Sequence, residues 1–213
     1  MASGAPVPFA RPHDLLWAAP DANVEFDGPR PPWLGADWLQ RAPLVVRRED
    51  TRDGRVPAGL RGIARNERCK CYVDQSAVLR WVSPEMLPVR AGCVDGRAVP
   101  ALDALAALAP EMDAIGLQWG PTGGVGFFLA CALPVLRPDS DLDLLVRAPQ
   151  PLSGPQAAAL AALQASAACR VDIQVDTGKG AFALAEWNRG GRRVLLKTGA
   201  GPVLTDDPWR TAA

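Results

Sequence analysis

The chain has 213 residues, of which 48% are hydrophobic and 22% charged, and its 23 basic residues balance its 23 acidic ones. This composition excludes a wholly disordered chain, and the length is enough to bury a core in one large domain or two small ones. A net charge of zero gives no general reason to expect a nucleic-acid partner. The uncharged run from Gly116 to Leu136 is interrupted by Pro and Gly, so we expect no membrane span.

The sequence disfavours a hydrolase triad, because histidine is scarce. His13 is the single histidine, and any Ser-His-Asp or Cys-His arrangement would have to use it. Cys69 and Cys71 form a lone Cys-Lys-Cys with no second pair at zinc spacing, so we interpret the five cysteines as small apolar residues of the core. The odd cysteine count, and a start without a secretory signal pattern, indicate a cytoplasmic protein.

Proline and glycine divide the chain near residues 84–100. We predict a small, mainly β domain over residues 1–88, with a strand at Leu44–Arg48, and a catalytic domain over residues 89–213. Between Arg47 and Lys70, eight basic residues stand against four acidic ones. This excess is typical of a solvated face, or of a surface that meets an anionic ligand or an acidic protein partner.

The second part alternates between helical and strand patterns. Ser153 is a predicted N-cap for the longest helix, which an Ala- and Leu-rich run extends to Ala168. In chain order we predict a helix at 100–108, a strand at 115–119, a glycine turn at 120–124, a helix at 127–132, a strand at 141–147, the helix that follows Ser153, a strand at 171–176, a helix at 181–187 and a final strand at 194–198.

Two carboxylates follow the glycine turn, in the sequence Asp141-Leu142-Asp143. Alternate residues of a strand share a face, so both side chains would project together, about 7 Å apart along the backbone. At an effective dielectric of 20 such charges repel by roughly 2 to 3 kcal/mol, and a Mg²⁺ ion would remove this repulsion. The alternative is an ordinary alternating strand with a solvent face.

The turn Gly120-Pro121-Thr122-Gly123-Gly124 precedes the carboxylate strand by about fifteen residues. Glycines let backbone N–H groups approach a phosphate, and the positive end of a following helix adds to the attraction, although the turn is also compatible with a plain loop.

A strand-helix-strand crossover places both strands in one sheet, which would bring Asp172 or Asp176 beside the first pair of acids. Asp176 reads as a turn residue at the strand end, so we select Asp172 as the third carboxylate. Lys197 is either a phosphate contact or a solvated charge.

The chain resembles the phosphoribosyl-dephospho-CoA transferases of malonate decarboxylase, which belong to the nucleotidyltransferase-like superfamily. The resemblance extends over nearly the whole length, and its family-specific parts are the amino-terminal blocks and the segment 180–187. It implies an α/β (α+β) fold: a nucleotidyltransferase-like palm with a mixed sheet and flanking helices, after a small mainly β domain. The chain departs from the general superfamily in one respect, because Gly123-Gly124 stands where Gly-Ser is usual.

The resemblance also implies a reaction. A phosphoribosyl-dephospho-CoA group passes from its triphosphate donor to a serine of the acyl-carrier subunit, and pyrophosphate leaves. In that reading Asp141 and Asp143 hold Mg²⁺, Asp172 completes the site or accepts the serine proton, and Thr122, Gly123 and Gly124 cradle the pyrophosphate. The side chains expected to face the acidic carrier are Arg61, Arg65 and Arg68. The alternatives are a nucleotidyltransferase with another acceptor and a non-catalytic scaffold with the same fold.

Overall fold

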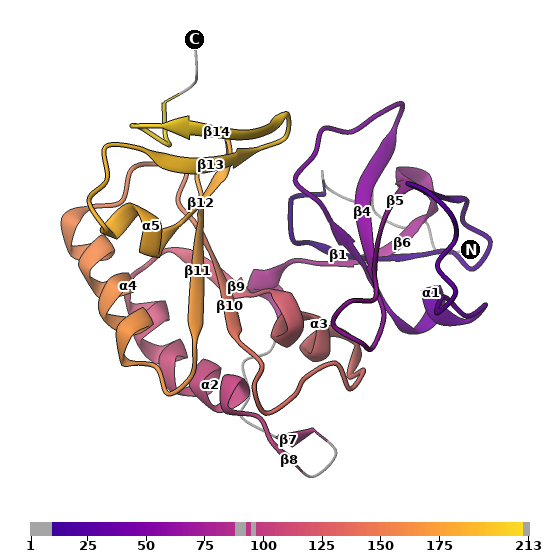
Figure 1. The fold of residues 1–213 in the computed structure, drawn as a ribbon, viewed down its shortest axis with the longest axis horizontal. Helices are drawn as coiled ribbons and strands as arrows, with labels where there is room; N and C mark the ends of the chain where they lie inside the picture. The colour runs from indigo at the N-terminus through magenta and orange to yellow at the C-terminus, as the bar shows by residue number, and fades with distance from the viewer. Residues whose placement is uncertain (1–9, 88–92, 95–96, 211–213) are drawn as a thin grey trace. The chain divides into compact units, whose positions relative to one another are not determined.

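The computed structural model describes residues 10–87, 93–94 and 97–210, and it contains two compact units (Figure 1). One unit comprises the chain up to Ser83 together with Phe127–Val135, and the other comprises Pro84–Gly126 and the chain from Leu136 onward. The boundary predicted between residues 88 and 89 lies outside the described residues.

The first unit is built on an antiparallel sheet of six short strands, in the order β2-β5-β4-β3-β1-β6. This confirms the mainly β amino-terminal part. The strand predicted at Leu44–Arg48 is present but ends earlier, at Val46. The elements of this unit are β1 (Leu15–Ala18), β2 (Val24–Phe26), α1 (Trp38–Arg41), β3 (Leu44–Val46), β4 (Arg55–Arg61), β5 (Arg68–Asp74), a 3-10 turn η1 (Gln75–Ala77) and β6 (Val78–Val82).

Apolar side chains from the central strands fill the core of this unit, among them Leu16, Leu44 and Leu60. Cys71 on β5 is fully buried with them. Burial raises the pKa of the Cys71 thiol to about 12, because a thiolate there would lose its hydration. Cys71 therefore behaves as the small apolar residue that the sequence predicts.

The second unit contains a mixed sheet of six strands in the order β14-β13-β12-β11-β10-β9. Strands β10 (Leu142–Arg147) and β11 (Val171–Asp176) run parallel, and α4 (Gly154–Ser166) connects them as the predicted crossover. This sheet and its flanking helices confirm the predicted α/β class. The remaining elements are η2 (Pro84–Met86), the hairpin β7 (Cys93–Val94) and β8 (Arg97–Ala98), α2 (Pro100–Ala114), β9 (Gln118–Pro121), α3 (Gly123–Cys131), β12 (Ala181–Ala183), α5 (Leu184–Asn188), β13 (Val194–Thr198) and β14 (Gly201–Thr205).

One face of this sheet packs against helices, and the other carries two acidic residues. One set of alternating side chains on β10 and β11, including Leu144 and Ile173, is buried, and α2 contacts β10 while α4 contacts β11 (Figure 1). The other set contains Asp143 and Asp172, which occupy register positions directly opposite each other. The pattern of alternation therefore places both acids on the face that α2 and α4 leave uncovered.

Local signals fix the starts of two helices, α4 and α2. Ser153 accepts a hydrogen bond from the backbone of Gln156, and the Gln156 side chain accepts one from the Ser153 backbone. This capping box starts α4 at the predicted residue. Pro100 likewise occupies the first turn of α2, as predicted, although α2 continues to Ala114 and is longer than expected.

Other predicted elements also differ from the structure. Residues 115–117 form a turn after α2, so the next strand, β9, begins only at Gln118. The predicted glycine turn is divided between two elements, because Gly120 and Pro121 end β9 while Gly123 and Gly124 begin α3. Residues 181–183 form the strand β12 before the short helix α5. The strand at 194–198 is not the last one, because a two-residue loop returns the chain as β14.

Gly120 on β9 allows a close backbone approach. A Cβ atom at this position would lie 2.1 Å from the Pro84 carbonyl oxygen, so η2 packs directly on the strand.

Among the described residues, no helix is both long enough and apolar enough to cross a membrane.

Candidate active site

The carboxylate of Asp143 lies against the first residue of α3. A Cβ atom added at Gly123 would stand 1.9 Å from Asp143 Oδ2, so the absence of a side chain creates the space that the carboxylate uses. Gly123 has φ of +56°, which glycine adopts readily, and it is exposed. The structure therefore brings together the two motifs that the sequence analysis singled out.

Backbone hydrogen bonds hold this contact in place. The Thr122 amide donates to the Asp143 carbonyl at 2.8 Å, and the Gly126 amide donates to the Thr122 carbonyl at 2.8 Å. Thr122 is itself buried, and its hydroxyl is 3.4 Å from the Asp143 carbonyl oxygen. Gly123 and Gly124 are the first residues of α3, and the first amides of a helix have no acceptor within that helix. The amides of these two glycines therefore lack helical acceptors at the end of α3 that lies beside the Asp143 carboxylate.

Asp172 is the register neighbour of Asp143 on the adjacent parallel strand. Neighbouring strands lie about 4.8 Å apart, so the two side chains project from backbone positions that are roughly this far from each other. The Asp172 carboxylate also pairs with Arg170 at 2.9 Å, and its side chain is 41% exposed. Asp176 is four residues further along and takes no part in this grouping.

Asp141 lies just outside β10, which begins at Leu142 rather than at the predicted Asp141. The Leu142 amide donates to the Arg170 carbonyl, which ties the start of β10 to the residue before β11. Burial is the main cause of the raised pKa of the neighbouring Cys169 thiol, and the charge of Asp141 raises it further. Within the described parts of the chain, no three His, Cys, Asp or Glu side chains are arranged to hold a metal ion by themselves.

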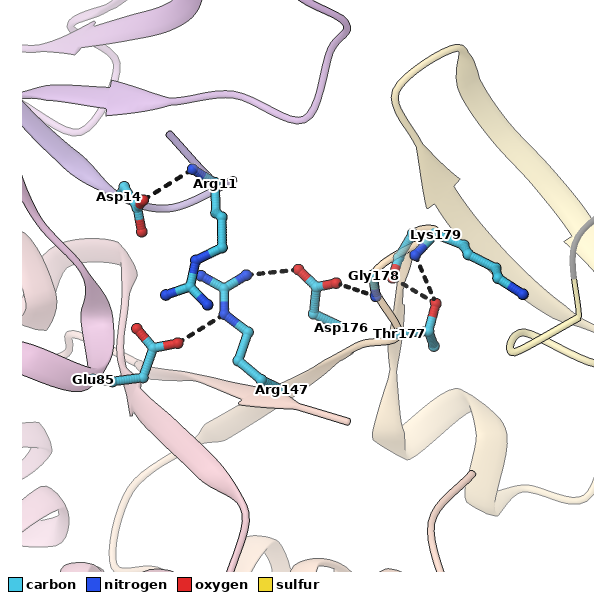
Figure 2. Close-up of polar contacts among 9 residues, drawn as sticks. Arg11, Asp14, Glu85, Arg147, Asp176, Thr177, Gly178 and Lys179 are labelled. Atoms are coloured by element: carbon cyan, nitrogen blue, oxygen red, sulfur yellow. Dashed lines mark hydrogen bonds and ion pairs between the residues drawn. The ribbon is translucent and has the colours of Figure 1, made fainter. Parts of the chain in front are cut away.

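The same sheet face carries a buried ionic cluster that the sequence analysis missed. The guanidinium of Arg147, at the end of β10, lies between two carboxylates (Figure 2). Its Nη1 donates to Asp176 Oδ2 and its Nε donates to Glu85 Oε1, each at 2.8 Å. Asp176 Oδ1 accepts the Gly178 amide at 2.8 Å, which makes Asp176 the turn residue that the sequence indicates. No local signal links Arg147 to Glu85, 62 positions away.

Replacing Asp176 with Ala should lower the free energy of unfolding by about 3 kcal/mol, because it removes a partner from a buried guanidinium and an acceptor from the Gly178 amide. Urea unfolding followed by fluorescence would measure the loss. Asp139→Ala is the matched control: Asp139 pairs with Arg137 in an exposed position, so its removal should cost less than about 1 kcal/mol. Equal losses in the two variants would contradict a structural role for the cluster.

Lys197 is exposed on β13 and does not join the site. It is in register with Ala181, which is in register with Asp176, so it lies at the level of Asp176 rather than of Asp172. Strand spacing and rise place it about 10 Å across the sheet and about 13 Å along it from Asp172. Its predicted phosphate contact stays a prediction, without support from this geometry.

The arginines predicted to contact a partner protein have different environments. Arg65 and Arg68 are exposed, whereas Arg61 is buried, with its guanidinium 5.5 Å from the centre of the Phe127 ring. Arg61 is thus a poor member of an exposed docking surface. The local excess of positive charge is also smaller than the count between residues 47 and 70 implies, because Arg55 pairs with Glu25 and Asp74, which lie outside that segment.

Comparison with known proteins places the chain in one family along its length. The N-terminal domain of phosphoribosyl-dephospho-CoA transferase MdcG matches residues 11–84, and the C-terminal domain matches residues 89–208. The chain belongs to the phosphoribosyl-dephospho-CoA transferase MdcG family. This confirms the resemblance inferred from the sequence, and both structural motifs of the site, the start of α3 and the carboxylates of β10 and β11, fall within the matched C-terminal domain.

Individual relatives in the MdcG family match at similar levels. A phosphoribosyl-dephospho-CoA transferase from Azotobacter vinelandii is 43% identical over 207 residues, which cover 95% of this chain and 96% of the relative. Proteins of the same name from Pseudomonas putida and Klebsiella pneumoniae strain 342 are 44% and 42% identical, over 93% of this chain and 95% and 96% of their own lengths. No solved structure matches the chain significantly.

Proposed function

We propose that this protein transfers a phosphoribosyl-dephospho-CoA group from its triphosphate donor to a serine hydroxyl of the acyl-carrier subunit of malonate decarboxylase. The contact between the Asp143 carboxylate and Gly123 carries the proposal. It places a carboxylate that can bind a metal ion beside a helix start whose backbone amides can bind phosphate. The name of the relatives, phosphoribosyl-dephospho-CoA transferase, supports the identity of the transferred group.

The residues present fit a Mg²⁺ ion. Mg²⁺ in phosphate-transfer sites is commonly bound through one or two carboxylates, waters and substrate phosphates rather than by a complete protein cage. Asp143 supplies one carboxylate at the helix start, with Asp141 and Asp172 as further candidates. When bound, the ion would neutralise charge on the triphosphate and on the departing pyrophosphate.

The groups that meet in the site then have separate roles in the reaction. The serine oxygen of the partner attacks the phosphorus next to the ribose, a phosphodiester bond forms, and the bond to the pyrophosphate breaks. The amides of Gly123 and Gly124 bind oxygens of the pyrophosphate. Asp172 either accepts the proton of the serine or completes the ligand set. The enzyme needs no nucleophile of its own, which agrees with its single histidine.

The direct test uses purified protein, triphosphoribosyl-dephospho-CoA and the acyl-carrier subunit. We expect the carrier to gain the mass of the group on its serine, one pyrophosphate to appear per transfer, and both to require Mg²⁺. A carrier with Ser→Ala is the control. Transfer to other acceptors in preference to the carrier would favour a different nucleotidyltransferase, and no Mg²⁺-dependent binding of a triphosphate by calorimetry would favour a scaffold.

Replacing Arg65 and Arg68 together with Ser should raise the KM for the carrier by about fivefold at low salt, and much less at 0.5 M salt, because exposed charges act mainly through screened attraction. Steady-state transfer at two ionic strengths would measure this. Arg52→Ser is a matched control, since Arg52 already pairs with Glu49. An increase in KM that is independent of salt would count against steering by these arginines.

A further inference from the structure

Arg170 forms an ion pair with one of the acids of the candidate site, Asp172. It comes directly before β11, and its Nη2 lies 2.9 Å from Asp172 Oδ2. Residues two apart on a strand share a face, so Arg170 and Asp172 project to the side that also carries Asp143. The Arg170 carbonyl accepts a hydrogen bond from the amide of Leu142, the residue between Asp141 and Asp143 in the sequence. This bond fixes the main chain of Arg170 next to the start of β10.

The side chain of Arg170, by contrast, is free to move at little cost. It is 70% exposed, and the Asp172 side chain is 41% exposed. Ion pairs with this exposure contribute little, because water screens them and both side chains lose conformational freedom. The buried guanidinium of Arg147 differs, since Glu85 and Asp176 hold it from two sides.

We propose that Arg170 is a further pyrophosphate-binding residue of this site, beside the amides of Gly123 and Gly124. It pairs with Asp172 in the free protein and exchanges that carboxylate for phosphate oxygens when the donor binds with its metal ion. The guanidinium forms paired hydrogen bonds to phosphate more strongly than an exposed bridge to one carboxylate. An extended arginine spans about 7 Å, which covers the distance from residue 170 to the level of Asp172 and Asp143. The inference rests on the proposed function for the identity of the donor.

This exchange predicts effects of opposite sign in one variant. In Arg170→Ala, Asp172 loses its competing cation, so the protein alone should bind Mn²⁺ about threefold more tightly. The same variant should bind inorganic pyrophosphate, in the presence of Mg²⁺, about tenfold more weakly, because a charge-assisted hydrogen bond is lost. Electron paramagnetic resonance of free Mn²⁺ measures the first effect and calorimetry the second, and neither requires turnover.

Matched variants separate this role from a general loss of charge. Arg137→Ala removes an exposed arginine from a pair with Asp139, and it should change neither affinity. Arg170→Lys should recover part of the pyrophosphate affinity. In an Asp172→Asn background, Arg170→Ala should no longer tighten Mn²⁺ binding. Thermal unfolding midpoints close to that of the parent protein would show that each variant is folded, as the exposure of Arg170 leads us to expect.

The possible outcomes are distinct. Tighter Mn²⁺ binding together with weaker pyrophosphate binding in Arg170→Ala supports the inference. If the parent protein binds Mn²⁺ but Arg170→Ala leaves either affinity unchanged, the inference is overturned while the proposed function stands. If the parent protein binds neither Mn²⁺ nor pyrophosphate with Mg²⁺, both are overturned.

Discussion

Replacing Asp143 with Asn should lower the rate of transfer by about a thousandfold while leaving the protein folded. The Asp143 carboxylate lies against the start of α3 and opposite Asp172, so its charge is at the point where the phosphates and their metal would meet. Asn has nearly the same shape and relieves the repulsion with Asp172, so the free energy of unfolding should change by less than about 1 kcal/mol.

Single-turnover transfer at several Mg²⁺ concentrations would measure the loss for Asp143→Asn. The rate should not recover at high Mg²⁺, because the missing group is a ligand and not a screening charge. Asp139→Asn is the control, since Asp139 is exposed in the loop before β10 and pairs with Arg137. Near-normal turnover of Asp143→Asn would refute the assignment of this carboxylate.

Replacing Gly123 with Ala should reduce transfer by about a hundredfold, which is the loss expected when a group at the reacting centre is misplaced by about 1 Å. The new methyl group would fall 1.9 Å from Asp143 Oδ2, so the carboxylate has to move. The positive φ of residue 123 adds a backbone cost of about 1 to 2 kcal/mol.

Gly116→Ala separates these two effects. Gly116 has φ of +74°, and a Cβ atom there would meet nothing within 4 Å. Both variants should therefore lose comparable stability in urea unfolding, whereas only Gly123→Ala should lose activity in the transfer assay. A comparable fall in activity in Gly116→Ala would show that backbone strain, and not displacement of Asp143, causes the defect.

Short-range signals allowed much of the second unit to be predicted. The capping residues Ser153 and Gln156 and the strict alternation from Val171 to Asp176 specify the β10-α4-β11 crossover. Asp172 was preferred because Asp176 has the position of a turn residue at the strand end, and the structure places Asp172 in register with Asp143. The placement of these two acids on adjacent strands could thus be predicted from local patterns, whereas their chemical role stays a prediction.

Long-range contacts determine the structural features that the sequence did not predict. Arg147 and Glu85 are far apart in sequence, and no pattern in either segment announces their pairing. Arg61 looks like part of a basic surface until Phe127, 66 positions later in the sequence, covers it. The sequence predicts a helix over residues 181–187, whereas pairing with β11 makes residues 181–183 a strand.

The parallel pairing of β10 and β11 has an evolutionary consequence. Hydrogen bonds between main chains, rather than flexible connections, set the gap between Asp143 and Asp172. Changes in the surrounding loops can therefore alter which molecules the enzyme accepts while the distance between the two acidic residues stays the same. We expect diversification of this family to be concentrated in those loops.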